Sequence, residues 1–561
     1  MNIRWVLLLA ASLLVGCGNQ EPLDKPTDLE VETGDREIRL NWTLSEEAAR
    51  YRVHLLTERD QALDDALDIL TTDQPPVRLN ELKNEQDYYL AVVAERWMRP
   101  DSEAARIGAR PEGTFTPLGG LNDTGLQQCY DGEADAMVEC TVEDWPGQDA
   151  EFGRDRLAAK GELDKHDSGH AGFDFTKIAA NGATLPADAE EWRCVRDNVT
   201  GLMWEVKTAD PEDWYADDDD IHALRHRWTW YNPDERVNAG RPGRRRASLG
   251  SCPLEYCSTD DLTAAVNEKG LCGYNDWRLP TVREWLSINS FRPSPVIRDW
   301  SSTFIDTEYF PSQRHRATDP FFWSANAFVN PLLNMEPGEE AESSGLAWNN
   351  LVAAGLQAPQ GSGLSSHVKL VRHVDEQDRY IDETIPPVEP RGEQKCVDNV
   401  SRSNLPDDLM PMPDGTVIHA EYGLMWMRCS IGQEWDGETC VGAPTTLDIQ
   451  SALLEAAESG HAGYDDWRVP NIKELDTLTE RSCAHPAIDL NIFPNTPRKS
   501  HAISATAVDW GAGSSRQENR DPAFFGITQD QGIVREIPVD LDNLRNHLPQ
   551  ETHVRLVRDL D

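Results

Sequence analysis

The chain has 561 residues, with 98 acidic and 53 basic side chains and a formal charge of −45. At roughly 100 to 200 residues per domain, this length predicts three or four folded units instead of a single core. An apolar content of 39 % and 18 tryptophans are typical of folded chains and exclude a largely disordered one. Because so acidic a surface would repel phosphates, the charge argues against nucleic acid as a partner.

Residues 1–16 have the features of a secretory signal peptide. Arg4 supplies a positive charge, and the apolar stretch that follows it is too short to span a bilayer. The sequence LVGC, which ends at Cys17, resembles the bacterial lipobox. This resemblance implies cleavage before Cys17 and attachment of acyl chains such as palmitate to that cysteine. Gly18, which follows the cysteine, resembles the residue of lipoproteins sent to the outer membrane. Residues 17–25 would then tether the protein to the membrane by its lipid.

The remaining ten cysteines form an even set, so disulfides are expected in an exported protein. No Cys-x2-Cys pair exists, and a zinc site is not predicted. Local bridges are expected for Cys129 with Cys140 and for Cys429 with Cys440, which enclose short stretches, and Cys396 is expected to pair with Cys483. The other four cysteines are expected to pair with one another, and the sequence does not decide which two bridges they form: Cys194, Cys252, Cys257 and Cys272.

Residues 26–111 alternate apolar and polar side chains, as at Ile38, Leu40 and Trp42, which predicts β-strands. Leu82 lies six residues before Tyr88, the spacing of a tyrosine corner. The stretch resembles a fibronectin type III domain, which implies an all-β sandwich. We expect it to act as a spacer from the membrane, with a binding role as the alternative.

Four sequence blocks recur in the same order in the rest of the chain, which indicates a duplication. TGLMWEVKT at 200–208 recurs as YGLMWMRCS at 422–430, and CGYNDWRLPTVREWLSI at 272–288 recurs as AGYDDWRVPNIKELDTL at 462–478. FWSAN at 322–326 returns as AISAT at 502–506, and HVKLVR at 367–372 returns as HVRLVR at 553–558. We expect a first repeat with an N-terminal extension at 118–374, an extended Pro-rich linker at 375–395, and a second repeat at 396–561.

A helix is predicted to begin inside each copy of the central block. Thr281 with Glu284, and Asn471 with Glu474, have the spacing of a capping box. The apolar side chains behind each cap would pack on the core.

The central block also carries a duplicated acid-aromatic-base motif, Asp276-Trp277-Arg278 in the first repeat and Asp466-Trp467-Arg468 in the second. The acid and the base of each copy could pair around a buried tryptophan. Because arginine prefers bidentate carboxylate partners, a salt-bridged structural role is favoured over a ligand site.

Together the blocks GLMW, GYxDWR[LV]Pxx[KR]E and V[KR]LVR resemble the C-terminal domain of the Legionella collagen-like adhesin. GLNDTGLQQCYDG and PGQDAEFGRD resemble the N-terminal extension of that family. The resemblance implies two α+β domains with a C-type-lectin-like fold, distantly similar to the formylglycine-generating enzyme. In adhesin members the domain is associated with binding of sulfated polysaccharides.

The sequence lacks the GxSxG, HExxH and Gx4GK[ST] motifs of common enzymes, and we predict neither catalysis nor a cofactor or metal. A formylglycine-type oxidase would need a reactive cysteine pair, for which Cys252 and Cys257 are the nearest candidates. A structural disulfide is favoured, since an activated thiol needs an exposed electropositive site.

One basic segment, GRPGRRR at 240–246, stands out in the acidic chain. The candidate ligand-binding residues in and near it are Arg225, Arg227, Trp230, Arg244, Arg245 and Arg246. Arginine forks suit sulfate oxygens, and Trp230 could stack on a sugar; a solvated insertion loop is the alternative. The acidic run 217–220 lacks the spacing of a calcium loop, which favours a solvated turn.

The sequence thus predicts a lipid-anchored protein of the cell envelope, with a fibronectin-like stalk and two α+β domains. Its expected role is adhesin-like binding of an extracellular glycan or protein. A structural subunit of an envelope complex is the alternative.

Overall fold

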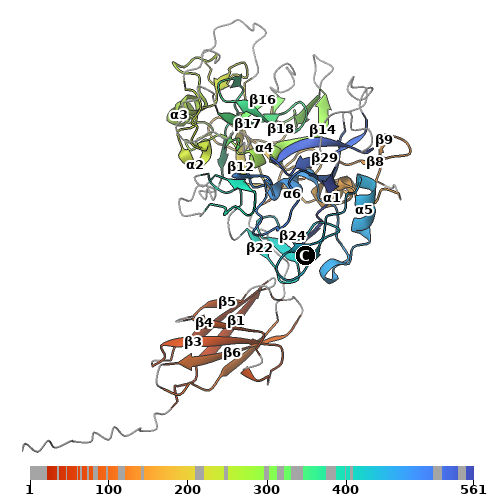
Figure 1. Cartoon of the computed structure of the whole chain (residues 1–561). Coiled ribbons are helices and arrows are strands. Elements are labelled where there is room, and N and C mark those ends of the chain that lie inside the picture. Colours follow the sequence, from red (N-terminus) through yellow and green to blue (C-terminus); the bar gives the residue numbers. More distant parts are fainter. Residues whose placement is uncertain are drawn as a thin grey trace, which may run out of the picture. The chain divides into compact units, whose positions relative to one another are not determined.

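The computed structural model divides into two compact units, one ending at Thr116 and one covering Pro117–Leu560 (Figure 1). The structure describes residues 22–560 except for 35–36, 46, 60, 64–65, 73–74, 80–81, 83–85, 97–98, 111–119, 141–143, 209–219, 246–250, 296–301, 312–320, 330–344, 375–386, 398–399, 405–407, 510–520 and 541–550. Cys17 and most of the expected linker therefore lie outside the described residues. No helix in the described ranges is long and apolar enough to cross a membrane.

The first unit is a sandwich of two antiparallel sheets. One sheet has the order β1 (Thr27–Gly34), β2 (Glu37–Thr43) and β5 (Val77–Leu79). The other has the order β4 (Asp68–Thr72), β3 (Arg50–Leu56), β6 (Tyr88–Glu95) and β7 (Ala105–Ala109). Leu40 and Trp42 of the alternating stretch, together with Val53 of β3, lie in the core between the sheets. The predicted all-β sandwich is confirmed.

Both repeats lie in the second unit, and each is built on a four-stranded antiparallel sheet. In the first repeat the order is β10 (Phe175–Ile178), β11 (Cys194–Asp197), β12 (Leu202–Glu205) and β20 (Val371–His373). In the second it is β22 (Leu409–Pro411), β23 (Thr416–His419), β24 (Leu424–Met427) and β32 (Val557–Asp559). In both repeats the strand of the GLMW block pairs with the strand of the closing LVR block, with Trp204 opposite Val371 and Trp426 opposite Val557.

A further sheet in each repeat carries the FWSAN or AISAT block. The first repeat has β16 (Phe321–Ala327), β17 (Leu346–Leu351) and β18 (Leu356–Gly361). The second has β30 (Ile533–Pro538), β29 (Ala523–Thr528), β28 (His501–Ala507) and β31 (Thr552–His553). β18 of the first repeat contacts β30 of the second.

Short strand pairs and a few helices complete the unit. The strand pairs are β8 (Cys129–Asp131) with β9 (Ala136–Val138), β13 (Trp228–Thr229) with β19 (Ser365–Ser366), β14 (Asn289–Pro295) with β15 (Ser302–Ile305), β21 (Lys395–Cys396) with β27 (Cys483–Ala484), and β25 (Glu434–Trp435) with β26 (Cys440–Val441). The helices are α1 (Gly153–Lys160), α2 (Glu235–Asn238), α3 (Thr259–Lys269), α4 (Val282–Ile288), α5 (Ile449–Ala457) and α6 (Ile472–Thr477), with 3-10 turns at Asp149–Glu151 and His461–Gly463. The described chain is therefore rich in β-sheet and has few helices.

The two predicted capping boxes are confirmed at the starts of α4 and α6. The Glu284 amide donates to Thr281 Oγ1 at 3.2 Å, and the Thr281 amide donates to the Glu284 carboxylate at 2.7 Å. The corresponding distances between Glu474 and Asn471 are 2.9 and 2.8 Å. Two helix donors that would otherwise lack acceptors are thus satisfied at each start.

One hydrophobic cluster is common to both repeats. A single cluster joins Phe291 and Phe304 of the first repeat to Leu475 and Phe525 of the second. The rings of Phe291 and Phe525 meet edge to face, with centroids 4.7 Å apart. Burial of such large apolar surfaces is the main driving force for the association of the repeats.

The extension that precedes the first repeat in sequence packs on the second repeat. Its Tyr130 and Trp145 belong to the cluster that contains Met425 and Phe524. The Trp145 ring stacks on Phe524, with centroids 6.3 Å apart. The chain therefore crosses from one repeat to the other before the first repeat begins.

Five disulfides stabilise the second unit. The structure contains the three expected bridges, Cys129–Cys140, Cys429–Cys440 and Cys396–Cys483. It resolves the open group as Cys194–Cys272 and Cys252–Cys257.

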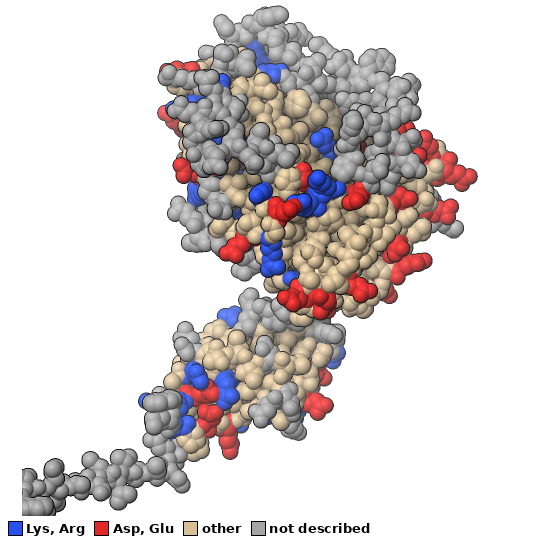
Figure 2. All heavy atoms as spheres, viewed as in Figure 1, with Lys and Arg blue, Asp and Glu red and all other residues tan. Residues whose placement is uncertain are grey.

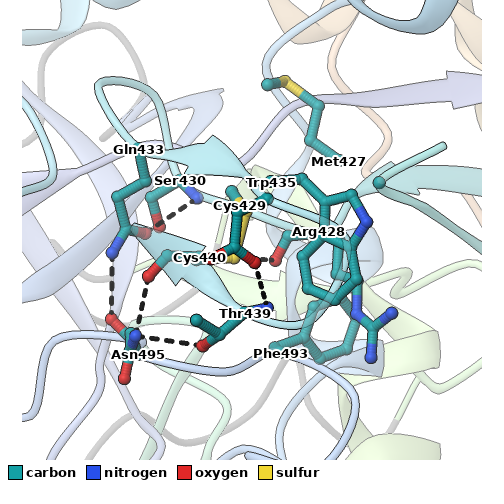
Figure 3. Close-up of a disulfide and its surroundings, with 12 residues drawn as sticks. Met427, Arg428, Cys429, Ser430, Gln433, Trp435, Thr439, Cys440, Phe493 and Asn495 are labelled. Carbon is teal, nitrogen blue, oxygen red and sulfur yellow. Dashed lines mark hydrogen bonds between the residues drawn. A yellow bond between two sulfur atoms is a disulfide. The ribbon is translucent and has the colours of Figure 1, made fainter. Parts of the chain in front are cut away.

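The bridge Cys429–Cys440 shows how such a loop is fixed (Figure 3). Asn495 donates to the Cys440 carbonyl oxygen at 2.7 Å and to Thr439 Oγ1 at 3.2 Å. The Gln433 side chain donates in turn to the Asn495 carbonyl oxygen at 3.2 Å. The disulfide loop is thus tied to a distant part of the second repeat.

Candidate functional site

The duplicated acid-aromatic-base motif is a structural element in both repeats. Trp277 and Trp467 are buried, and each indole N–H donates to a backbone carbonyl oxygen, of Leu271 at 3.0 Å and of His461 at 2.9 Å. Each tryptophan therefore fixes the loop before its own motif.

The expected pairing of acid with base inside the motif is wrong. Asp276 pairs with Arg372, Oδ1 to Nε at 2.6 Å, and Asp466 pairs with Arg558 at 2.7 Å. These arginines belong to the closing strands β20 and β32. Because neighbouring side chains on an extended segment point to opposite sides, the acid contacts the closing strand while its neighbouring arginine points elsewhere.

Arg278 and Arg468 instead form bidentate pairs with the cap glutamates. The Arg278 nitrogens lie 2.8 and 2.6 Å from the Glu284 oxygens, and Arg468 lies 2.7 Å from each oxygen of Glu474. Burial alone would raise the pKa of Glu284, but Arg278, His373 and the Thr281 amide together lower it to about 2. The same glutamate thus caps the helix and neutralises the arginine.

Two cations cross between the repeats at the helix ends. Arg283, at the start of α4, donates to the Thr477 carbonyl oxygen at the end of α6 at 2.9 Å. Lys473, at the start of α6, donates to the Ser287 carbonyl oxygen near the end of α4 at 2.8 Å. Each helix therefore supplies a cation to the C-terminal carbonyls of the other, where intrahelical donors are missing and cations are favoured.

Lys473 is buried beside the acidic residues of the extension. Its ammonium also donates to the Asp123 carbonyl oxygen at 2.7 Å. Burial lowers the pKa of Lys473 to about 7, although Asp155 and Asp123 act in the opposite direction. Burial, with Asp123 nearby, raises the pKa of Asp149 to about 8. This junction is a buried polar network that ties the extension to both repeats.

A cavity adjoins the motif in each repeat. Cavity 1, of about 170 Å³, is bordered by Arg278, Thr281 and Glu284 of the first repeat. Cavity 2, of about 250 Å³, is bordered by the corresponding Arg468, Asn471 and Glu474 of the second. Leu121 and Tyr422 border both. The duplication has therefore produced two related concave sites where the repeats meet.

The predicted basic residues lie in the first repeat, away from these cavities. Thr229 Oγ1 donates to the Arg244 carbonyl oxygen at 2.9 Å, which holds the basic segment against β13. Arg245 is bidentate to Asp261, with nitrogens 3.0 and 2.6 Å from Oδ1, and its guanidinium lies 5.2 Å from the ring centre of Tyr256. Arg225 and Arg227 are half-buried, Arg244 is exposed, and Arg246 lies outside the described residues.

The expectation that Trp230 stacks on a sugar is wrong. The Trp230 ring is 1 % exposed, and its indole N–H donates to the Ser324 carbonyl oxygen at 2.9 Å. Trp228 is equally buried. Both rings belong to the hydrophobic core of the first repeat, so they are closed to a ligand. The aromatic side chain that lies beside Arg245 is Tyr256, inside the Cys252–Cys257 loop.

Acidic side chains spread over the visible face of the second unit, and basic ones gather in smaller groups (Figure 2). Of the acidic run, 217–219 lie outside the described residues, and Asp220 accepts from Thr208 Oγ1 at 2.8 Å. Within the described ranges, no group of three or more His, Cys, Asp or Glu side chains is placed to hold a metal ion.

Sequence reasoning missed Arg283 and Lys473. A signal was present, because each is a cation one residue after an apolar position in a helix that packs on the core, at the [KR] of the central block. Their partners are backbone carbonyls of the other repeat, and such partners leave no mark in a sequence.

We expect Glu284→Gln to lower the free energy of unfolding by about 3 kcal/mol near neutral pH, because it leaves the Arg278 charge without its partner. The pKa of Glu284 in the folded protein, about 2, is below its ordinary value of 4.5, so this stabilisation is present above pH 4.5 and is lost as the pH falls toward 2. The difference between variant and wild type should therefore shrink over that range in urea denaturation.

The control is Asp261→Asn, which weakens a pair whose arginine, Arg245, keeps half of its side chain in solvent, and should cost at most about 1 kcal/mol. A difference between Glu284→Gln and wild type that stays constant from pH 5 to pH 2 would contradict the assigned role of Glu284.

Solved structures of fibronectin domains match part of the chain. The structure "FN3tt mut" matches with 20 % identity over 16 % of this chain and 93 % of its own, with a TM-score of 0.14. The fn3 domain of human collagen alpha-1(XX) chain matches with 28 % identity over 18 % of this chain and 98 % of its own, with a TM-score of 0.15. The chicken CNTN1 FN1-FN3 domains match with 21 % identity over 16 % of this chain and 31 % of their own, also with a TM-score of 0.15.

No curated protein matches the chain. The model of the Lcl C-terminal domain matches residues 193–372 and 415–558, one range in each repeat. These two ranges together cover more than half of the 561 residues. The chain belongs to the Lcl C-terminal domain family.

Proposed function

We propose that this protein is a binding module of the cell envelope, adhesin-like and not catalytic, that recognises an extracellular glycan or protein. The observation that carries the proposal is that two Lcl C-terminal domains are joined by a shared hydrophobic cluster and stabilised by five disulfides. Disulfides persist in oxidising compartments and suit a domain that works outside the cytoplasm.

The proposal includes a lipid anchor on Cys17 and an outer-membrane location, supported by the lipobox-like sequence. The fibronectin-like unit would then act as the spacer between the lipid and the repeats. A C-type-lectin-like description of the two repeats belongs to the same proposal. No nucleic-acid partner is included, because the chain carries a charge of −45.

The surface proposed for a sulfated glycan is the basic segment with Arg244, Arg245 and Tyr256. Arg244 is exposed, and Arg245 keeps half of its side-chain surface in solvent while it pairs with Asp261. Guanidinium groups recognise sulfate oxygens, and an aromatic ring can support a sugar face.

The alternative function is a structural subunit of an envelope complex. A formylglycine-type oxidase is a weaker candidate, because Cys252 and Cys257 are bonded to each other. If thiol titration of the native protein finds two free cysteines at these positions, the oxidase is favoured.

For the anchor, we expect palmitate to label the wild-type protein and not Cys17→Ala, since the acyl chains would be attached to that residue. Labelling would be measured in the envelope fraction of cells that express either form. Equal labelling of both forms would exclude the lipid-anchor proposal.

For the ligand, we expect saturable binding of the mature chain to sulfated glycans on an array. The double variant Arg244→Ala with Arg245→Ala should bind at least fivefold more weakly, because two sulfate-binding groups are removed. Arg535→Ala, which removes an exposed arginine from β30, is the matched control and should bind as wild type.

A lack of binding across sulfated and unsulfated glycans would exclude the glycan version. Specific recovery of other envelope proteins with the wild-type chain would then favour the structural-subunit alternative.

A further inference from the structure

Backbone groups without partners lie at the border of cavity 2. Two of its border residues, Gly120 and Gly153, have no side chain, so their backbone atoms form the wall there. The N–H and C=O groups of Gly120 and the N–H group of Gly153 have no hydrogen-bond partner among the described residues. Gly120 is half-buried and Gly153 is exposed. Because backbone groups in folded proteins are nearly always paired with protein atoms or water, these groups remain for a molecule in the cavity.

Two charged side chains at the same border also keep accessible atoms. Arg154 Nε donates to the Gly172 carbonyl oxygen at 2.9 Å, whereas its two Nη groups are not buried and have no partner in the part of the chain that the structure describes. Asp559 accepts from Arg468 through Oδ1 at 2.9 Å, and 59 % of its side chain is exposed. Both oxygens of Glu474, by contrast, are taken by Arg468. The open groups of cavity 2 therefore include donors and acceptors.

The charges at the border favour an uncharged ligand. An anion would lie beside the carboxylates of Glu474 and Asp559, and a cation would lie beside the guanidinium groups of Arg154 and Arg468, so neither sign is preferred. A hydroxyl group carries no charge and can both donate and accept a hydrogen bond. Several hydroxyl groups on one small molecule would therefore match the open groups of cavity 2.

The rest of the wall is aromatic and apolar. Phe152, Tyr422, Leu121 and Val199 border the cavity, and all four are half-buried. Small-molecule sites typically combine such a wall with a few polar groups. The volume of about 250 Å³ exceeds that of an engineered cavity, of about 150 Å³, that holds benzene, which leaves room for hydroxyl groups around a six-membered ring.

We propose that cavity 2 binds one neutral pyranose unit of a glycan. Its hydroxyl groups would bond to Gly120, Gly153, Arg154 and Asp559, and its C–H face would contact the apolar wall. The inference rests on the proposed recognition of a glycan, but the site is separate from the basic segment with Arg244.

The test is saturation-transfer NMR of the full mature chain with three neutral sugars, the methyl pyranosides of glucose, galactose and N-acetylglucosamine. We expect saturable binding of at least one of them. Val199→Trp, at the border of cavity 2 and not of cavity 1, should weaken this binding at least tenfold, because the indole would occupy the cavity. Val441→Trp introduces the same side chain at an exposed position of β26 and should bind as wild type.

A second variant tests the polar border. Arg154→Gln should weaken binding of the sugar at least fivefold, because the open Nη groups are lost. Arg156→Gln, at a half-buried position of the same helix that does not border the cavity, is the matched control. The double variant Arg244→Ala with Arg245→Ala should bind the neutral sugars as wild type, so that a failure of this site and a failure of the basic segment are distinguishable.

Methyl glucuronide, which carries a carboxylate, should bind more weakly than any neutral sugar that binds. The thermal transition of each variant shows whether it is folded. The proposal is overturned if none of the three neutral sugars binds saturably, if folded Val199→Trp or Arg154→Gln binds as wild type does, or if the glucuronide binds most tightly.

Discussion

The reciprocal hydrogen bonds of Arg283 and Lys473 are the constraint on which the second unit depends. Each cation leaves the start of its own helix and reaches the last carbonyls of the other, so α4 and α6 run past one another in opposite directions. A helix end buried without donors would be costly, and here the donors come from the other repeat. Neither helix is fully satisfied unless both repeats are present. The shared aromatic core around Phe291 and Phe525 reinforces this dependence by burying apolar surface between the same elements.

The candidate sites follow from this junction. The capping boxes that begin α4 and α6 also hold Arg278 and Arg468, so each helix start places a guanidinium at the border of a cavity. The extension makes the two cavities different, because Asp123, Asp149 and Phe152 border only the second. The duplicated domain has thus produced two related cavities, and acidic and aromatic side chains of the extension border only the second.

Local features were predictable from the sequence. The sandwich strands, both capping boxes and the disulfides Cys129–Cys140 and Cys429–Cys440 depend on short spacings, and each is present in the structure. The partners of Asp276 and Asp466 were not predictable, since they lie on the closing strands some ninety residues away. The prediction that Trp230 contacts a ligand was wrong, because its place beside arginines in the sequence does not show that its ring lies in the core. The hydrogen bonds of Arg283 and Lys473 were not predicted either, because both cations donate to backbone carbonyls of a segment far along the chain.

Amide hydrogen exchange of wild type and Arg283→Met tests most directly whether the two repeats form one cooperative body. The substitution lies in the first repeat and removes the donor to the Thr477 and Ser403 carbonyl oxygens of the second. We expect amides in α6 and β24 of the second repeat to lose protection together with those in α4 and β12 of the first. Loss of protection confined to the first repeat, with α6 and β24 unchanged, would contradict a shared body.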